Sequence, residues 1–196
     1  FQAVESPLAV DVLMHRREFW RPTSTGRLIN RVMPASRHHL FNREALPTRE
    51  AVARPGRELW ILHPRGETLP ENAAPENLQV LLLDGSWREA AAMAHHVGAW
   101  GRLVRLPAAG PSRNALRRQE NAGNYSTIES LLFLLAALGL GETEARLRLQ
   151  FELHVYAGLR TRGAKVLAEE FLATSPIRDA FPDLLAQLHE RRVNEQ

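Results

Sequence analysis

Cysteine is absent from the 196 residues, and lysine occurs once, at position 165. The lack of cysteine excludes disulfides, thiolate nucleophiles and cysteine-ligated zinc or iron–sulfur sites. Long apolar runs are also missing, since the longest, Leu131 to Leu140, has about half the length of a membrane span. The N-terminal segment lacks the basic start, apolar middle and small-residue cleavage site of a signal peptide. We therefore expect a cytoplasmic protein with no membrane partner.

Length and composition predict one folded domain over residues 1–196. A domain typically has roughly 100–200 residues. Apolar residues make up 44% of the chain and charged residues 24%. This balance excludes a disordered or collagen-like chain. The sequence leaves the oligomeric state open.

The positive charge is carried almost entirely by arginine and is unevenly distributed. The net charge is only +3, but residues 16–65 hold eleven arginines against four acids. Residues 90–119 hold five arginines and no acid. The planar guanidinium suits phosphate, so two basic stretches on a small domain favour a polyanionic partner such as nucleic acid. The alternative is an arginine-rich genome that scatters arginine where other proteins use lysine.

Alternating strand and helix patterns predict an α/β fold with a mainly parallel sheet flanked by helices. The clearest strand is Leu78–Asp84, whose consecutive aliphatic residues are typical of burial on both faces. Other strands are expected at residues 10–15, near 39–42, at 58–63 and at 102–107. Helices are expected at residues 27–33 (capped by Thr23 or Thr25), from 48, at 87–97 and from 126 to about 139. A helical C-terminal part is expected over residues 141–196, with helices at 142–162, 165–173 and 177–190.

Three expected strand ends carry residues suited to ligand binding, because ligands of open α/β sheets bind beyond the carboxyl ends of the strands. These ends are His63-Pro-Arg-Gly66, Asp84-Gly-Ser-Trp87, and Leu106-Pro107 with the long connection 108–125 behind it. The second combines a carboxylate, a glycine that permits close approach, a hydroxyl and an indole. The alternative is that Asp84 and Ser86 only cap the following helix and that Trp87 packs beneath it.

Other patterns indicate structure rather than chemistry. Ser126-Thr-Ile-Glu129 has the spacing of a helix capping box. The adjacent pairs His38-His39 and His95-His96 point in different directions and do not make a zinc pattern. Gly139-Leu-Gly141 lacks the strand-then-helix context of a dinucleotide-binding loop.

Three ordered blocks resemble the DTW-domain family over about residues 10–140. Asp84-Gly-Ser-Trp87 resembles the signature Asp-x-Thr-Trp, with Ser86 in place of threonine and the hydroxyl kept. The segment His15-Arg-Arg-Glu-Phe-Trp-Arg-Pro-Thr-Ser-Thr-Gly-Arg-Leu28 resembles the block His-x-x-Glu…Arg-Pro-Thr-x-Thr-Gly. Leu116-Arg117, followed by Ser126-Thr-Ile-Glu-Ser130, resembles the block Leu-Arg then Ser-Thr-x-Glu-Ala.

The resemblance implies an enzyme with a nucleoside donor and an RNA acceptor. The family is known as tRNA-uridine aminocarboxypropyltransferases, which move the 3-amino-3-carboxypropyl group of S-adenosylmethionine onto a uridine base nitrogen and release methylthioadenosine. Their fold is similar to that of SPOUT methyltransferases, with a deep trefoil knot. Two other functions stay open, a SPOUT-type RNA methyltransferase and a non-catalytic RNA-binding module. The N-terminal cysteine cluster of many members is missing here, so no metal is expected.

The resemblance also assigns roles to residues. Asp84 is the expected catalytic base for the uridine imide nitrogen, or else holds the donor's amino group or ribose. The expected S-adenosylmethionine-binding residues are His63, Pro64, Leu83, Gly85, Ser86, Trp87, Leu106, Pro107, Arg117, Ser126 and Thr127. Trp87 could instead stack on a base or pack on its helix. Arg16, Arg17, Arg21, Arg27 and Arg118 are expected to contact tRNA phosphates, and each could equally be a solvated surface residue.

Overall fold

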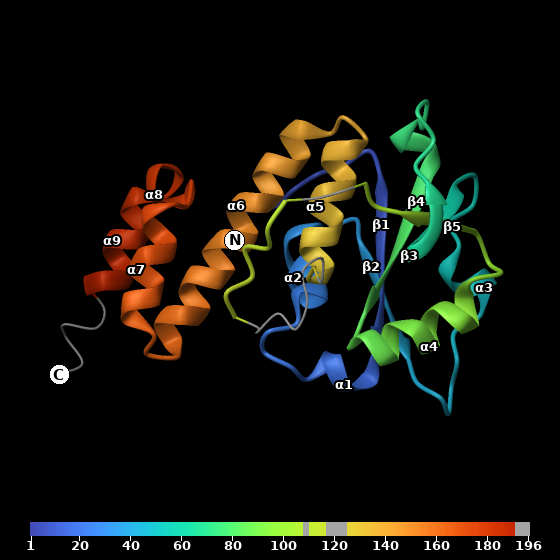
Figure 1. The fold of residues 1–196 in the computed structure, drawn as a ribbon, viewed down its shortest axis with the longest axis horizontal. Coiled ribbons are helices and arrows are strands. Elements are labelled where there is room, and N and C mark those ends of the chain that lie inside the picture. The colour runs from blue at the N-terminus through green and yellow to red at the C-terminus, as the bar shows by residue number, and fades with distance from the viewer. Residues whose placement is uncertain (108–109, 117–124, 191–196) are drawn as a thin grey trace.

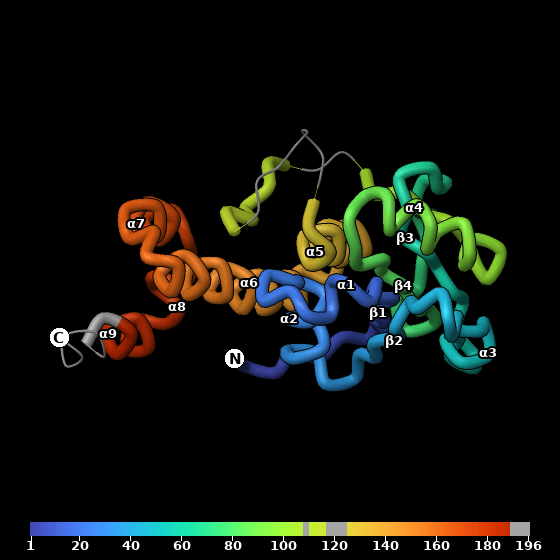
Figure 2. The backbone as a smooth tube through the Cα atoms, turned by 90° about the horizontal axis from the view of Figure 1, so that it is seen from below, coloured from blue at the N-terminus to red at the C-terminus, as the bar shows by residue number. Residues whose placement is uncertain are grey.

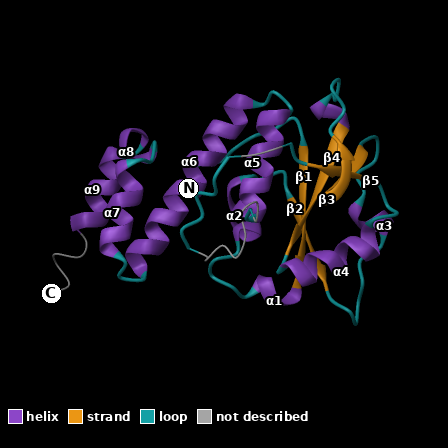
Figure 3. Ribbon diagram, viewed as in Figure 1, coloured by secondary structure: helices purple, strands orange, loops and turns teal. Residues whose placement is uncertain are grey.

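The computed structural model describes residues 1–107, 110–116 and 125–190. Within them, five strands form one all-parallel sheet in the order β2-β1-β4-β3-β5. The strands are β1 (Ala9–His15), β2 (Arg37–Phe41), β3 (Glu58–Thr68), β4 (Leu78–Asp84) and β5 (Arg102–Arg105). The mixed α/β class and the parallel sheet flanked by helices are confirmed (Figure 3).

Helices cover both faces of the sheet (Figure 1). On one face lie α2 (Thr25–Val32) and α5 (Thr127–Ala137), with the long α6 (Gly141–Thr161) packed outside them. On the other lie α3 (Arg49–Val52) and α4 (Trp87–Val97), while α1 (Arg16–Phe19) follows β1 directly. The helices α7 (Lys165–Ala173), α8 (Ile177–Ala180) and α9 (Pro182–Glu190) gather around the far end of α6 (Figure 2). A short 3₁₀ turn, Pro75–Asn77, precedes β4.

Strand β4 lies in the middle of the sheet because its sequence is apolar on both sides. It pairs with β1 through Val12↔Leu82 and Met14↔Asp84, and with β3 through Ile61↔Leu81. Side chains such as Leu82 face the core beneath α2, α5 and α6, whereas Leu81 faces the smaller core beneath α3 and α4. Both cores fix the end of β4, and therefore Asp84, relative to the helices that follow.

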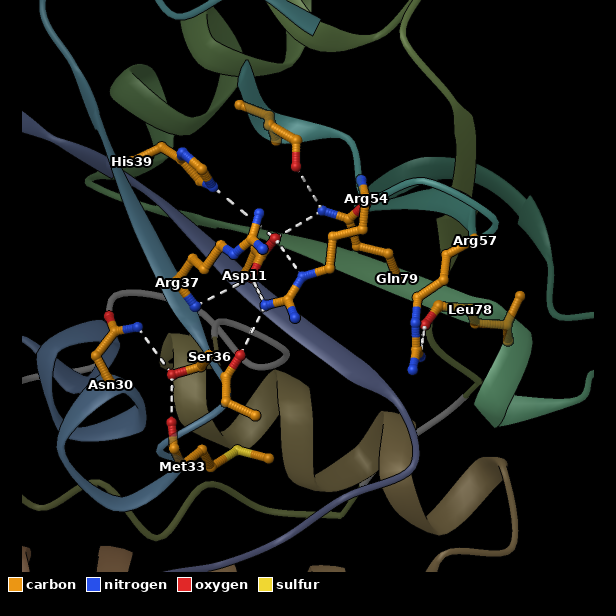
Figure 4. A network of polar contacts seen from close by, with 12 residues as sticks. Asp11, Asn30, Met33, Ser36, Arg37, His39, Arg54, Arg57, Leu78 and Gln79 are labelled. Atoms are coloured by element: carbon orange, nitrogen blue, oxygen red, sulfur yellow. Dashed lines mark hydrogen bonds and ion pairs between the residues drawn. The ribbon is translucent and has the colours of Figure 1, made fainter. Parts of the chain in front are cut away.

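A buried polar network ties β1 to its neighbours beside the smaller core. Asp11 is fully buried and accepts hydrogen bonds from the side chain of Arg54, from Gln79 Nε2 at 2.7 Å and from the Arg37 N–H at 3.0 Å. His39 Nε2 lies 3.8 Å from Asp11 Oδ2, which is beyond hydrogen-bond distance. Figure 4 shows these side chains converging on Asp11.

Several predicted element boundaries are wrong. The strand expected at 102–107 ends at Arg105, and the helix expected at 27–33 spans Thr25–Val32. Strand β3 does not end at His63 but continues to Thr68, with a register shift against β5 between Leu62 and Glu67. The cap of α2 is Ser24, whose Oγ accepts from the Arg27 N–H at 3.3 Å, and not Thr23 or Thr25. The helix expected at 177–190 is two helices, because the backbone leaves the helical conformation at Phe181 before the proline that starts α9.

Candidate active site

Asp84 is the last residue of β4, and its carboxylate lies against the N-termini of two helices, α2 and α5. Asp84 is only 3% exposed. Ser24 Oγ, the cap of α2, donates to Asp84 Oδ2 at 2.8 Å. Thr127 Oγ1, in the first residue of α5, donates to Asp84 Oδ1 at 2.5 Å. A carboxylate at the positive ends of two helices is electrostatically favourable.

The N-terminus of α2 is packed closely against this carboxylate. A Cβ on Gly26 would lie 2.6 Å from Asp84 Oδ2, which is well inside contact distance. The neighbouring Thr25 Oγ1 accepts from the Ile128 N–H at 3.4 Å and so joins α2 to α5. The two helices therefore hold Asp84 as one unit.

Glu129 organises the start of α5. Its Oε2 accepts from the N–H and the Oγ of Ser126, at 2.9 and 2.6 Å, which completes the capping box that the spacing predicts. Its Oε1 accepts from Ser112 Oγ and from the N–H groups of Arg113 and Asn114, at 2.7, 2.6 and 3.2 Å. Glu129 is 2% exposed, so it fixes residues 112–114 against the helix whose first residue contacts Asp84.

A matching capping box starts α4. Glu89 Oε2 accepts from the N–H and the Oγ of Ser86, both at 2.8 Å. Its Oε1 lies 3.1 Å from His15 Nδ1 and 3.9 Å from Arg17 Nη1. Burial acts to raise the pKa of Glu89, but the donors on Ser86 and the charges of His15 and Arg21 lower it below its ordinary value. The ends of β1 and β4 are thereby linked through α4.

The predicted site residues around β4 lie together. Leu83 and Gly85 flank Asp84, Ser86 caps α4, and Ser126 and Thr127 start α5. Trp87 is 51% exposed in the first turn of α4, so it does not pack beneath that helix. The alternative was that Asp84 and Ser86 only cap the helix that follows them. Ser86 does cap α4, but the carboxylate of Asp84 accepts hydrogen bonds from Ser24 at α2 and Thr127 at α5.

The residues predicted on the two neighbouring strands occupy the same edge of the sheet. Leu106 and Pro107 directly follow β5, while His63 and Pro64 lie inside β3, at its register shift, rather than after its end. Burial, together with the charge of Arg65, lowers the pKa of His63 below its ordinary value. In the strand order β3 follows β4 and β5 follows β3, so these residues lie on the β3 side of Asp84 at the carboxyl edge of the sheet.

Four of the predicted RNA-contacting arginines lie on the α1–α2 segment. Arg16 and Arg17 belong to α1, Arg21 to the connection, and Arg27 to α2, and all four are exposed. Arg21 Nη1 donates to the buried Glu18 Oε1 at 2.5 Å. Arg117 and Arg118, predicted to contact the donor and the RNA, lie outside the described residues.

Sequence reasoning from the residues alone missed Ser24, Gly26 and Glu89. Ser24 and Gly26 lie next to Asp84 in space but far from it in the chain. Glu89 lies in α4, three residues after Ser86, which is the spacing of a capping box. The signal that pointed to Ser24 and Gly26 was the block from His15 to Leu28, which contains both. In the part of the chain that the structure describes, no cluster of three or more histidine and acidic side chains is arranged to hold a metal ion. None of the helices in that part has the length and hydropathy to span a bilayer.

The fold and the site define an α/β protein whose buried carboxylate lies at the carboxyl edge of a parallel sheet, between two helix N-termini. The family model described as DTW domain matches residues 1–157. The chain therefore belongs to the DTW-domain family, which is linked to tRNA modification. Searches of curated proteins and of solved structures gave no match.

Proposed function

We propose that this chain transfers the 3-amino-3-carboxypropyl group of S-adenosylmethionine to a uridine base nitrogen in tRNA, with release of methylthioadenosine. One observation carries the proposal. The three blocks that resemble the family motifs, far apart in sequence, meet at one carboxylate through Ser24, Asp84 and Thr127. Family membership supports the tRNA substrate, and the arginines of the α1–α2 segment support binding of its phosphates.

The residues at this edge suit the proposed donor. Its amino group and sulfonium are positive and match the negative charge of Asp84. Its carboxylate is assigned to Arg117 or to the N–H of Thr127, because the N–H groups of Ser126 and Ile128 already donate to Glu129 Oε2 and Thr25 Oγ1. Leu83, Gly85, Leu106 and Pro107 offer backbone at the same edge for the adenine. When bound, S-adenosylmethionine supplies a methylene carbon that its sulfonium activates.

Asp84 supplies a fixed negative charge at the site of transfer. The hydroxyls of Ser24 and Thr127 hold both carboxylate oxygens, so the direction of the carboxylate is set before a substrate arrives. In one use, an oxygen of Asp84 accepts the proton that the uridine imide nitrogen loses. In the other, the carboxylate holds the donor's amino group and so aims the aminocarboxypropyl arm. The base role predicts that removing the charge slows transfer while donor binding is kept, whereas the anchoring role predicts weaker donor binding when the charge is removed.

We also propose a SPOUT-like fold with a deep trefoil knot, and one domain over residues 1–196. The all-parallel sheet supports the first. For the second, Arg113, on the segment that Glu129 fixes, donates to Glu152 on α6 at 3.1 Å and to Thr174 after α7 at 3.0 Å. These contacts join the C-terminal helices to the segment beside the site.

Product analysis tests the proposed reaction. The protein is incubated with tRNA and S-adenosylmethionine, and the small-molecule product and the nucleosides of the tRNA are identified. Methylthioadenosine together with an aminocarboxypropylated uridine supports the proposal. S-adenosylhomocysteine would indicate a methyltransferase instead. The absence of turnover with retained tRNA binding would indicate an RNA-binding module.

A further inference from the structure

Trp20 is a large aromatic side chain left in solvent beside the candidate site. It follows α1 directly and is 76% exposed. An indole exposed to this extent leaves a broad apolar face in water, which folding ordinarily removes. Such a residue on a basic surface is suited to contact a flat aromatic partner.

The ring of Trp20 is supported from beneath by the protein. Phe19 packs against the main core, and its ring meets that of Trp20 edge to face, with centroids 5.0 Å apart. Arg27 in turn lies over the Phe19 ring at 5.7 Å and donates to the Phe19 carbonyl at 3.1 Å. The indole is therefore held in position by Phe19 and Arg27, and less conformational entropy is lost when a partner stacks on it.

The surroundings of Trp20 favour a polyanion over an apolar protein segment. Arg16, Arg17 and Arg21 have side chains that are half exposed or more. Each lies within 4.0 Å of a glutamate oxygen. The ion pairs of Arg16 and Arg17 involve exposed guanidinium groups and contribute little to stability, so these two arginines can exchange a carboxylate for a phosphate at small cost. Arg21 stays paired with the buried Glu18 and adds its positive charge to the same surface.

Trp20 lies one short connection away from the Asp84 carboxylate. Ser24, which donates to Asp84 at 2.8 Å, is four residues further along the chain. Four residues span at most about 14 Å even when fully extended. The backbone of this connection is folded further, because the N–H of Ser24 donates to the carbonyl of Arg21. A nucleotide next to one bound at Asp84 is therefore within reach of the indole.

We propose that Trp20 is a stacking platform for an unpaired RNA base that neighbours the uridine presented to Asp84. The position of that uridine rests on the proposed function. The platform recognises single-stranded RNA, because a base inside a duplex has no free face to offer. The flanking arginines bind the phosphates on either side of the stacked base.

Binding of two RNA probes tests this proposal. One probe is a hairpin with an unpaired uridine-rich loop, and the other is the same strand annealed to its full complement. Trp20→Leu, which keeps an apolar side chain without a ring, should weaken hairpin binding about tenfold and leave duplex binding unchanged. Trp20→Phe should retain most hairpin affinity. Val166→Ala, which trims a similarly exposed apolar side chain on α7, should change neither.

Equal losses for both probes, no loss with Trp20→Leu, or a wild type that binds neither probe would overturn the platform. Because Trp20 is exposed, the variants should melt at the wild-type temperature, which is measured alongside. The product analysis separates this proposal from the proposed function. If the wild type releases no methylthioadenosine but Trp20→Leu selectively loses hairpin binding, the proposed reaction is wrong and the stacking role of Trp20 is supported. If the wild type is active in transfer but Trp20→Leu shows no selective loss, the stacking role is wrong and the proposed reaction is supported.

Discussion

Gly26 lies directly against the carboxylate of Asp84. A Cβ at Gly26 would be 2.6 Å from Asp84 Oδ2 and 2.7 Å from its Cγ, distances that real Cβ contacts do not reach. The absence of a side chain at Gly26 thus sets the position of the carboxylate, which the hydroxyls of Ser24 and Thr127 then hold.

Gly26→Ala should displace Asp84 and impair both stability and transfer. We expect the free energy of unfolding to fall by about 1–3 kcal/mol, the usual cost of overpacking. Transfer should fall about 100-fold if the carboxylate moves by about 1 Å. Gly141→Ala is the matched control, because no heavy atom lies within 4 Å of a Cβ there. Urea unfolding and the rate of methylthioadenosine release measure the two effects, and a fully active Gly26→Ala protein would contradict them.

Thr127→Val removes one of the two hydroxyls that hold Asp84 and keeps the branched shape of the side chain. A buried carboxylate then loses a donor, which should cost about 1–3 kcal/mol of stability. Thr127→Ser keeps the hydroxyl and should stay close to wild type in both stability and transfer. If valine and serine variants behave alike in melting and turnover assays, the hydrogen bond to Asp84 has no such role.

Protonation of Asp11 in acid should lower the free energy of unfolding. Burial acts to raise the pKa of Asp11, but His39, the hydrogen bonds and charge of Arg54, and the Arg37 N–H together lower it below its ordinary value of 3.8. A carboxyl with a lowered folded-state pKa stabilises the fold above its unfolded pKa, and this contribution is lost as pH falls through the folded value.

The free energy of unfolding should therefore decline as pH drops below about 4. Asp11→Asn should be less stable at pH 7 and should show a shallower decline in acid. Urea titrations between pH 7 and pH 3 measure both. An unchanged acid slope in Asp11→Asn would show that other carboxyls carry the pH dependence.

RNA affinity should fall steeply with salt, because the arginines near α1 release counterions when they bind phosphate. The slope of log affinity against log salt is about −0.7 to −0.9 per phosphate contact. Arg17→Ala should reduce that slope by about one. Arg178→Ala, an exposed arginine on α8, is the control and should leave the slope unchanged. A flat salt response of the wild type would contradict the basic binding surface.

Local sequence signals predicted the elements that place Asp84. The strand Leu78–Asp84, the helix Trp87–Val97 and the helix Lys165–Ala173 are confirmed with the expected bounds. The Ser126–Glu129 capping box forms as its spacing predicts, and Ser86 caps α4 as expected, although its partner Glu89 was not predicted. These features depend on residues three or four apart or on runs of apolar side chains, which are properties of the sequence itself.

The contacts that complete the site could not be predicted from local patterns, because they join distant segments. Ser24 and Thr127 lie 60 and 43 residues from Asp84 in the chain. Three consecutive hydroxyl residues, 23–25, could each have capped α2, and only the packing of α2 against Asp84 selects the middle one. The Pro64-Arg-Gly66 pattern predicts the end of a strand, but a Cβ on Gly66 would lie 2.5 Å from the Val104 backbone, so this glycine permits close packing of β3 on β5.

The most direct test of the account compares wild type with Asp84→Asn, which keeps the size of the side chain and removes its charge. Methylthioadenosine release and tRNA affinity are measured on the same preparations, with the exposed Asp179→Asn on α8 as control. We expect Asp84→Asn to lose release by about 100-fold or more and to keep tRNA affinity close to wild type. An Asp84→Asn protein that folds and transfers at the wild-type rate would contradict the assignment of the reaction to this carboxylate.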